Sequence, residues 1–164
     1  ILVMLACRLR YEVCSATQIA MTLEEKKKDV RVIALLDTLE YLKRGGRISK
    51  TAAFAGNLLS IKPVIAIVDG EVAVLGKARG SKNGCNMLRE EVTKHNGIDF
   101  SLPVCLGYTG LSDAMLQKYI RDNADLWEGH IHTLPISSIG STIGTHTGPD
   151  GICVAFFSAE HIDK

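Results

Sequence analysis

The chain has 164 residues, of which 46% are hydrophobic and 23% charged, and its formal net charge at pH 7 is +1. This length is enough for one domain with a substantial buried core. The balanced charge argues against a nucleic-acid-binding protein, because such proteins concentrate a basic excess on one face.

The first ten residues, ILVMLACRLR, are largely apolar. The apolar part is much shorter than a membrane span, and the stretch lacks the basic start and the small-residue cleavage site of a signal peptide. We expect the interior of a helix whose upstream part is missing, so that the chain is a fragment without stable membrane insertion.

Two short segments carry helix-start signals. Ser15 and Gln18 in SATQ fit a capping box, which predicts a helix that runs to about residue 28. DTLE (37–40) offers a second capping box, and Gly45 and Gly46 are expected to end the short helix that follows. Between these helices the aliphatic run VRVIALL predicts a buried strand.

A β-hairpin is the clearest prediction in the middle of the chain. Two apolar, β-branched runs within 61–79 flank Asp69 and Gly70, a pair typical of a type I′ turn. Just before the hairpin, Ser49 is a candidate cap for a helix over 50–59.

The second half of the chain predicts two helices and three strands. The helices cover 81–95, ended by Gly97, and 112–124, with Ser112 as N-cap. The predicted strands are 102–110, 130–136 and 151–157. Because the hairpin breaks a strict β-α-β alternation, we expect an α+β domain with a sheet packed against helices, and not a doubly wound sheet.

Metal-ligand spacing is absent from the cysteines and histidines. The cysteines are odd in number, scattered and without a CxxC pair, which favours a reducing, cytoplasmic setting; they are Cys7, Cys14, Cys85, Cys105 and Cys153. His130 and His132 would share one face of the strand predicted at 130–136, but we expect no cysteine or carboxylate partner to complete a metal site with them. We therefore expect no metal site.

His146 and Arg47 are the two candidate ligand-binding residues. His146 lies in GTHTGPDG, where a Gly-Pro turn would hold the imidazole at a rigid corner at the edge of the sheet. Arg47 follows the double glycine of RGGRI, and its planar guanidinium matches a carboxylate or a phosphate. Each has an ordinary alternative: a histidine satisfied by local backbone groups, and an exposed arginine at a helix end.

Two familiar enzyme motifs are missing. GKARGSKNG contains no P-loop pattern, and the chain has no G-x-S-x-G nucleophile elbow.

Arg79 lies beside Lys77 and Lys82, before the helix predicted from residue 81. It either helps to bind an anion or belongs to a solvated rim.

Two long stretches, DTLEYLKRGGRISKTAAFAGNLLSIKPVIAIVDGEVAVLGKARG and GTHTGPDGICVAFF, closely resemble the DegV family of bacterial fatty-acid-binding proteins. The family includes the binding subunit of the fatty-acid kinase system. The resemblance covers nearly the whole chain, 1–164, and is to the C-terminal lipid-binding domain, with the N-terminal α/β domain absent. It implies a mixed, largely antiparallel sheet in a two-layer sandwich with helices.

The resemblance also implies roles for three residues. His146 of HTGP would hydrogen-bond the fatty-acid carboxylate, Arg47 of GGRIS would join the polar network around this head group, and Arg79 of KARG would lie where the kinase docks. The family's threonine and serine ligands for the carboxylate belong to the N-terminal domain. Asp150 departs from the family pattern, which has glycine there, and its carboxylate would repel an anionic head unless it points to solvent.

The physical chemistry agrees with this implied function. A buried acyl chain gains about 0.8 kcal/mol per CH₂ group, whereas a buried carboxylate without hydrogen-bond donors costs several kcal/mol. Arg47 and His146 can supply the donors. The candidates for the tail channel, which are equally good candidates for ordinary core, are Phe54, Leu58, Leu59 and Ile143.

The sequence therefore predicts a carrier that buries a long-chain fatty acid as its ligand, uses no other cofactor and performs no catalysis. It would present the carboxylate to a separate, ATP-dependent kinase that forms an acyl-phosphate for phospholipid synthesis. One alternative is a hydrolase or phosphotransferase that uses His146 and Arg47 on a small anion. Another is a purely structural interaction domain.

Overall fold

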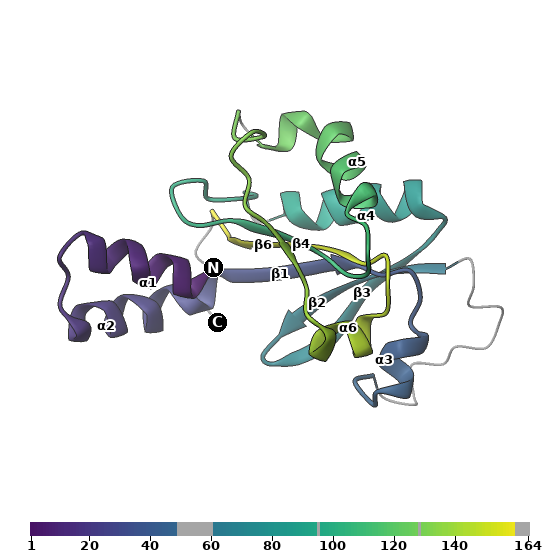
Figure 1. The fold of residues 1–164 in the computed structure, drawn as a ribbon, viewed down its shortest axis with the longest axis horizontal. Coiled ribbons are helices and arrows are strands. Elements are labelled where there is room, and N and C mark those ends of the chain that lie inside the picture. The colour runs from purple at the N-terminus through teal and green to yellow at the C-terminus, as the bar shows by residue number, and fades with distance from the viewer. Residues whose placement is uncertain (49–60, 95, 128, 160–164) are drawn as a thin grey trace.

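The fold is a six-stranded mixed sheet with helices on both faces (Figure 1). The computed structural model describes residues 1–48, 61–94, 96–127 and 129–159. The strand order is β3-β2-β1-β6-β4-β5, and every neighbouring pair is antiparallel except β4 and β5. The predicted α+β class, with a mixed and largely antiparallel sheet, is confirmed.

The strands are β1 (Val30–Leu35), β2 (Ile61–Val68), β3 (Glu71–Arg79), β4 (Cys105–Tyr108), β5 (Ile136–Ser138) and β6 (Ile152–Phe157). The α-helices are α1 (Leu2–Tyr11), α2 (Ala16–Lys26), α3 (Glu40–Arg44), α4 (Ser81–Thr93), α5 (Ala114–Asp122) and α6 (Ser141–Thr147). Two 3₁₀ turns, η1 (Lys27–Asp29) and η3 (Ala124–Trp127), follow α2 and α5.

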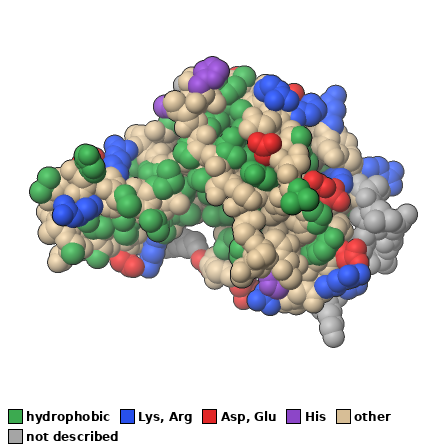
Figure 2. All heavy atoms as spheres, viewed as in Figure 1, with side chains coloured by type: hydrophobic (Ala, Val, Ile, Leu, Met, Phe, Trp, Pro, Cys, Tyr) green, Lys and Arg blue, Asp and Glu red, His purple; other side chains and the backbone are tan. Residues whose placement is uncertain are grey.

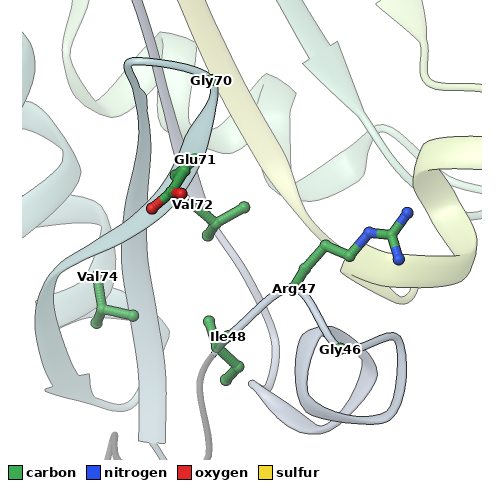
Figure 3. Close-up of a pocket in the computed structure, with 7 residues that line it drawn as sticks. All are labelled: Gly46, Arg47, Ile48, Gly70, Glu71, Val72 and Val74. Carbon is green, nitrogen blue, oxygen red and sulfur yellow. The ribbon is translucent and has the colours of Figure 1, made fainter.

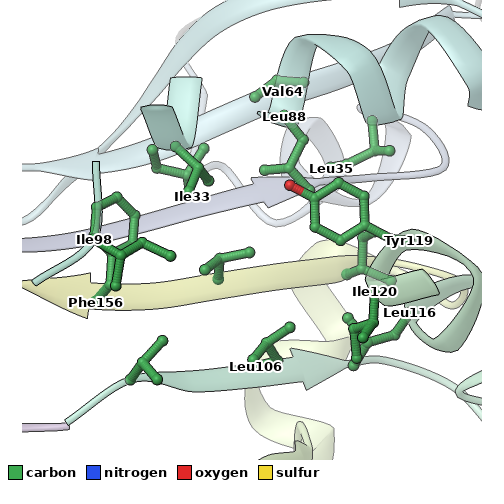
Figure 4. Close-up of a cluster of buried hydrophobic side chains, with 14 of the residues drawn as sticks. Ile33, Leu35, Val64, Leu88, Ile98, Leu106, Leu116, Tyr119, Ile120 and Phe156 are labelled. Atoms are coloured by element: carbon green, nitrogen blue, oxygen red, sulfur yellow. The ribbon is translucent and has the colours of Figure 1, made fainter. Parts of the chain in front are cut away.

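The first face of the sheet, which carries Ile33, Leu35, Val64, Leu106 and Val154, packs against α4 and α5 (Figure 4). These helices add fully buried side chains such as Leu88 and Tyr119. At Gly84 of α4, a Cβ atom would lie 2.7 Å from Leu35 Cδ1, so the missing side chain lets the helix lie directly on β1. The first face therefore holds the main hydrophobic core.

The second face, which carries Ala34, Ile65, Val72, Val74 and Cys153, has a thinner cover. Because side chains alternate along a strand, these residues point away from the main core. Figure 1 shows the short helices α3 and α6 on this side, opposite α4 and α5. The buried residues here form a small cluster of Leu36, Leu39, Leu42 and Ile65.

The helical hairpin α1–α2 extends from the sheet at the start of β1 (Figure 1). Its first helix, α1, confirms the helix predicted from the apolar residues at the start of the sequence, and the predicted capping box of α2 is present. Gln18 N donates to Ser15 Oγ over 3.3 Å, and Ser15 N donates to Gln18 Oε1 over 2.8 Å. Hydrophobic side chains are visible over much of this hairpin in Figure 2. Val3, Tyr11 and Met21 of these two helices are exposed.

The central hairpin is also confirmed, because Asp69 and Gly70 both have positive φ, as a type I′ turn requires. The second capping box is wrong. Helix α3 begins with Leu39 as its N-cap and has no side-chain cap. Asp37 forms an ion pair with Lys62 of β2 instead, so a tertiary contact takes the carboxylate that the local pattern assigned to the helix.

The strand predicted at 130–136 is wrong for most of its length. Strand β5 begins only at Ile136, and residues 130–133 form a turn in which Thr133 N donates to His130 O over 2.9 Å. The ring of His130 stacks on Phe100 at 4.8 Å. In helix α5, Asp113 occupies the N-cap position, one residue after the predicted Ser112, and makes no side-chain cap hydrogen bond. The helix predicted at 50–59 lies outside the described residues.

Candidate functional site at the α3–α6 contact

The double glycine ends α3 in a Schellman motif. Gly46, with φ of 68°, takes the left-handed position, its N–H donates to Lys43 O over 3.1 Å, and Arg47 N donates to Leu42 O over 2.9 Å. Arg47 is therefore the second residue beyond the helix end. Its position is set by backbone hydrogen bonds, as the predicted end of the helix requires.

His146 lies on helix α6 and not in a turn at the sheet edge. The prediction that His146 lies at a rigid corner at the sheet edge is wrong, because Ser141–Thr147 is helical and the turn begins only at Gly148. Three threonines and a glycine gave the segment little helix propensity. Two of them, Thr145 and Thr147, donate hydrogen bonds to the carbonyls four residues earlier.

Helices α3 and α6 meet through two reciprocal glycine contacts. A Cβ atom on Gly45 of α3 would lie 2.0 Å from His146 Nδ1, so the imidazole occupies the space of a missing side chain. A Cβ atom on Gly148 would lie 2.3 Å from Tyr41 Cδ2 of α3. Each helix therefore accommodates an aromatic ring of the other, and this packing fixes the place of His146.

The two nitrogens of His146 have different surroundings. Nδ1 is buried against α3 and has no hydrogen-bond partner among the described residues. A buried N–H without an acceptor would cost about 1–3 kcal/mol. Of the two tautomers of the imidazole, this packing therefore favours the one with its proton on Nε2, which leaves Nε2–H as a donor.

Arg47 also contacts Gly45. Its Nη1 donates to Gly45 O over 2.8 Å, while the side chain as a whole is exposed. The imidazole of His146 and the guanidinium of Arg47 both contact Gly45, although they are 99 residues apart in the chain. The two side chains that the sequence singled out thus lie together.

A groove of about 640 Å³ begins at Arg47 and extends along the second face (Figure 3). One wall is Gly46, Arg47 and Ile48, and the other is Gly70, Glu71, Val72 and Val74 of the β2–β3 hairpin. In Figure 3, Ile48 belongs to the first wall and Val72 and Val74 to the second, and the side chain of Arg47 lies on the side of α6. Among the described residues, the groove is lined by three aliphatic side chains, two glycines, Arg47 and Glu71.

The profile of a protein family described as "Uncharacterised protein, DegV family" matches residues 1–159. The chain belongs to the DegV family. A DegV domain-containing protein of Caldanaerobacter subterraneus subsp. tengcongensis is 35% identical over 156 residues, which are 94% of this chain and 54% of that protein. The chain thus spans about half the length of the curated relatives that it matches.

Two solved DegV-type structures are similar to the chain. A DegV family protein from Thermus thermophilus, described by its fatty acid binding, has a TM-score of 0.74 and 28% identity and covers 96% of this chain and 55% of its own. A stearic-acid-binding protein from Eubacterium ventriosum has a TM-score of 0.68 and 25% identity, and the match covers 96% of this chain and 54% of that protein. Two further DegV structures, from Thermotoga maritima and Streptococcus agalactiae, are described as a lipid-binding and a fatty-acid-binding protein.

Other predicted site residues of this DegV chain lie away from the groove or outside the described part. Ile143 is on α6 with 54% of its side chain exposed and does not line the groove. Phe54, Leu58 and Leu59 lie outside the described residues. Arg79 is exposed at the end of β3 that is remote from the hairpin turn, and its role as a docking residue stays a prediction.

Asp150 lies in the turn between α6 and β6 with φ of 58° and an exposed side chain. This left-handed conformation is the one that glycine adopts without strain, which explains why glycine suits the position. Its carboxylate faces solvent, so water screens its repulsion of a nearby anion.

Sequence reasoning missed the residues that shape the site: Tyr41, Gly45, Ile48, Glu71, Val72 and Val74. The period-two alternation of β3 did place Val72 and Val74 on one face. No local pattern shows that residues 46–48 lie opposite that face, because the groove forms from segments more than twenty residues apart.

A pair of thiols lies elsewhere on the second face. Cys153 of β6 lies opposite Gly107 of β4, two residues from Cys105 on the same face, and a Cβ atom on Gly107 would lie 2.9 Å from Cys153 Sγ. Burial raises the pKa of the Cys153 thiol to about 11, and the neighbouring Cys105 adds to the shift. Cys153 therefore stays protonated and unreactive at neutral pH.

Within the described ranges, no three or more His, Cys, Asp and Glu side chains gather in a way that would hold a metal ion. In the same part of the chain, no helix has both the length and the apolar character needed to cross a membrane.

Proposed function

We propose that this chain binds a long-chain fatty acid, with the carboxylate at Arg47 and His146 and the acyl tail along the second face of the sheet. One observation carries the proposal above all others. The guanidinium of Arg47 and the imidazole of His146, from distant parts of the chain, both contact Gly45, and Arg47 also lines a groove with three aliphatic side chains.

The groove suits an acyl chain in size and chemistry. Its volume of about 640 Å³ is within the usual range for ligand pockets, roughly 300–1,000 Å³. Ile48, Val72 and Val74 offer apolar contacts, and each CH₂ group removed from water contributes about 0.8 kcal/mol. A tail of sixteen or eighteen carbons would therefore supply most of the binding free energy.

The charges along the groove set the orientation of the acid. Arg47 attracts a carboxylate, whereas Glu71 on the hairpin repels one. Nε2–H of His146 adds a donor beside Arg47, and a buried carboxylate requires such donors. We therefore place the head at the α3–α6 contact and the tail toward the β2–β3 hairpin.

The DegV relatives support this function. The proteins from Thermus thermophilus and Eubacterium ventriosum, at 28% and 25% identity, are described as binding a fatty acid and stearic acid. Since the curated relatives are about twice as long as this chain, we also propose that it forms the C-terminal lipid-binding domain and that an N-terminal domain completes the site around the head.

The carrier would serve a separate, ATP-dependent fatty-acid kinase. A bound acid with its tail buried and its carboxylate at the surface is oriented for phosphoryl transfer to the carboxylate. Arg79 is exposed and has Lys82 nearby on α4, which gives a cationic surface for docking. The chain itself would perform no catalysis.

Binding is tested by titration with stearate and with methyl stearate, which keeps the tail but has no charge. Arg47→Ala should weaken stearate binding by about tenfold, the loss of one charge-assisted hydrogen bond, and leave methyl stearate unaffected. Arg44→Ala is the matched control, because Arg44 is equally exposed but pairs with Glu40 over 2.5 Å. Equal affinities for stearate in all three proteins would contradict the placement of the head.

The carrier role is tested by supplying the stearate complex and ATP to a fatty-acid kinase. Arg79→Ala should lower the rate of acyl-phosphate formation while stearate affinity stays unchanged, with Arg121→Ala on α5 as an exposed control. Turnover of a small ester or phosphate ester by the purified protein alone would instead indicate the hydrolase or phosphotransferase.

A further inference from the structure

The two glycines that end α3 have different physical reasons to be glycine. Gly46 has φ of 68°, and a Cβ atom there would meet no other atom within 4 Å, so its backbone conformation alone requires glycine. Gly45 has φ of −76° and ψ of −2°, which any residue adopts. Its side-chain position is filled by the imidazole of His146, with Nδ1 at 2.0 Å and Cε1 at 2.8 Å.

The contact at Gly45 also determines what His146 can offer. Packed on Gly45, Nδ1 is buried and meets no hydrogen-bond partner in the described part of the chain. The backbone groups of Gly45 pair elsewhere: Gly45 N donates to Tyr41 O over 2.8 Å, and Gly45 O accepts from Arg47 Nη1. A proton on Nδ1 would thus be buried without an acceptor.

We infer that Gly45 is a positioning residue for the fatty-acid head. Because Gly45 has no side chain, the imidazole of His146 packs against it with Nδ1 unprotonated, and Nε2–H is directed toward the carboxylate. The inference rests on the proposed function and adds a residue that touches no ligand itself. Arg47 belongs to the same arrangement, because its hydrogen bond to Gly45 O holds the guanidinium at the residue against which the imidazole packs.

The reciprocal contact, between Tyr41 and Gly148, keeps α6 packed against α3. The ring of Tyr41 lies on Gly148, 2.3 Å from the place of a Cβ atom, and so anchors the end of α6 directly after His146. Gly148 has φ of 75°, so this second glycine is needed both for its backbone and for the space that Tyr41 occupies. Two rings and two glycines thus fix the imidazole relative to α3.

The tautomer gives a test that needs no ligand. In alkaline buffer, where imidazoles are neutral, ¹⁵N NMR of the labelled protein should show His146 as one form with its proton on Nε2. His130, which stacks on Phe100 outside this site, serves as the internal comparison. A proton on Nδ1 of His146, or an averaged mixture of both forms, would overturn the inference.

The second test compares the two glycines. Gly45→Ala should displace the imidazole and weaken stearate binding about tenfold, as His146→Ala does, by the loss of one hydrogen bond to the carboxylate. Gly46→Ala strains the helix end but leaves the imidazole seated, so folded Gly46→Ala protein should bind stearate with nearly the wild-type affinity. Equal loss of affinity from both substitutions would overturn the inference.

A double variant covers the case in which Gly45→Ala folds poorly. In a His146→Ala background the space beside residue 45 is empty, so adding Gly45→Ala should cause almost no further loss of thermal stability or stearate affinity. Equal destabilisation by Gly45→Ala with and without the imidazole would show that His146 is not what requires the glycine, and would overturn the inference.

The outcomes separate this inference from the proposed function. If the wild-type protein binds neither stearate nor another long-chain acid, the proposed function fails, whatever the tautomer. If the wild-type protein binds stearate and Gly45→Ala binds it equally well, the function stands and the role of Gly45 fails.

Discussion

The two faces of the sheet differ in how completely they are covered. On the first face, α4 and α5 bury a large continuous core in which side chains such as Leu88, Leu106 and Val154 have no exposed surface. On the second face, two helices of five and seven residues cover a small cluster and leave a groove. The first face therefore accounts for most of the stability, and the second leaves room for a ligand.

Each face also holds one buried polar atom without a hydrogen-bond partner in the described part of the chain: Tyr119 Oη on the first and His146 Nδ1 on the second. The phenol of Tyr119 is enclosed by the core, whereas the imidazole of His146 packs on Gly45. The first unsatisfied group is a cost in stability, and the second belongs to the site that we propose for the fatty-acid head.

The largest effect should come from the core of the first face. Leu88→Ala removes a side chain with no exposed surface, so the free energy of unfolding should fall by about 2–5 kcal/mol. Val72→Ala in the half-buried wall of the groove should cost clearly less stability but should weaken stearate binding. Urea unfolding and stearate titration of both variants measure the contrast, which similar stability losses would contradict.

The thiol of Cys153 should make stability depend on alkaline pH. Its pKa is raised from 9.0 to about 11 in the folded protein, so between these values the unfolded chain loses a proton that the folded chain keeps. The free energy of unfolding should therefore fall as pH rises through this window, by an amount on the order of 2 kcal/mol.

Urea unfolding at about pH 9 and about pH 11 measures this dependence, which Cys153→Ala should reduce. Cys7→Ala is the control, since that thiol is exposed on α1. An identical pH dependence in wild type and Cys153→Ala would show that the thiol is not buried as described.

Removing the unpartnered phenol of the first face should not destabilise the protein. Tyr119→Phe keeps the ring that packs edge-on against Trp127 at 6.0 Å and deletes only the hydroxyl. The free energy of unfolding should stay constant or rise by about 1 kcal/mol. Burial also holds the pKa of Tyr119 above its usual range, so absorbance titration should lose its last-titrating tyrosine in this variant.

The smallest effect is expected at Asp150. Asp150→Gly relieves a left-handed backbone but loosens the unfolded chain, so the free energy of unfolding should rise by only about 0.5 kcal/mol. Asp150→Ala keeps the strained backbone and removes the same charge. Thermal unfolding should therefore separate the two variants, whereas stearate affinity should be equal in both. A fall in stability with glycine would contradict the strain.

Local signals in the sequence predicted much of the first face and of the hairpins. Ser15 with Gln18, Asp69 with Gly70, and the double glycine at 45–46 each act within a few residues, so their structures follow from local chemistry. Asp37 shows the limit: its predicted capping role yields to an ion pair with Lys62, a residue 25 positions away.

The sequence singled out His146 and Arg47, and the structure brings both against Gly45, but their binding of a ligand stays a prediction. The helix that holds His146 was not predicted, because its sequence consists of weak helix formers and it packs against α3. The second wall of the groove comes from the β2–β3 hairpin, and only the folded chain brings Val72 and Val74 opposite Ile48.

The placement of the acyl tail on the second face can be measured by photo-crosslinking. A stearic acid analogue with a diazirine on its tail, bound to the protein and irradiated, should label peptides that contain Ile48, Val72 or Val74, and excess stearate should suppress the labelling. Labelling of the first-face core at Leu88 or Leu106, or of the groove on the α1–α2 hairpin at Leu2 and Leu23, would contradict this placement.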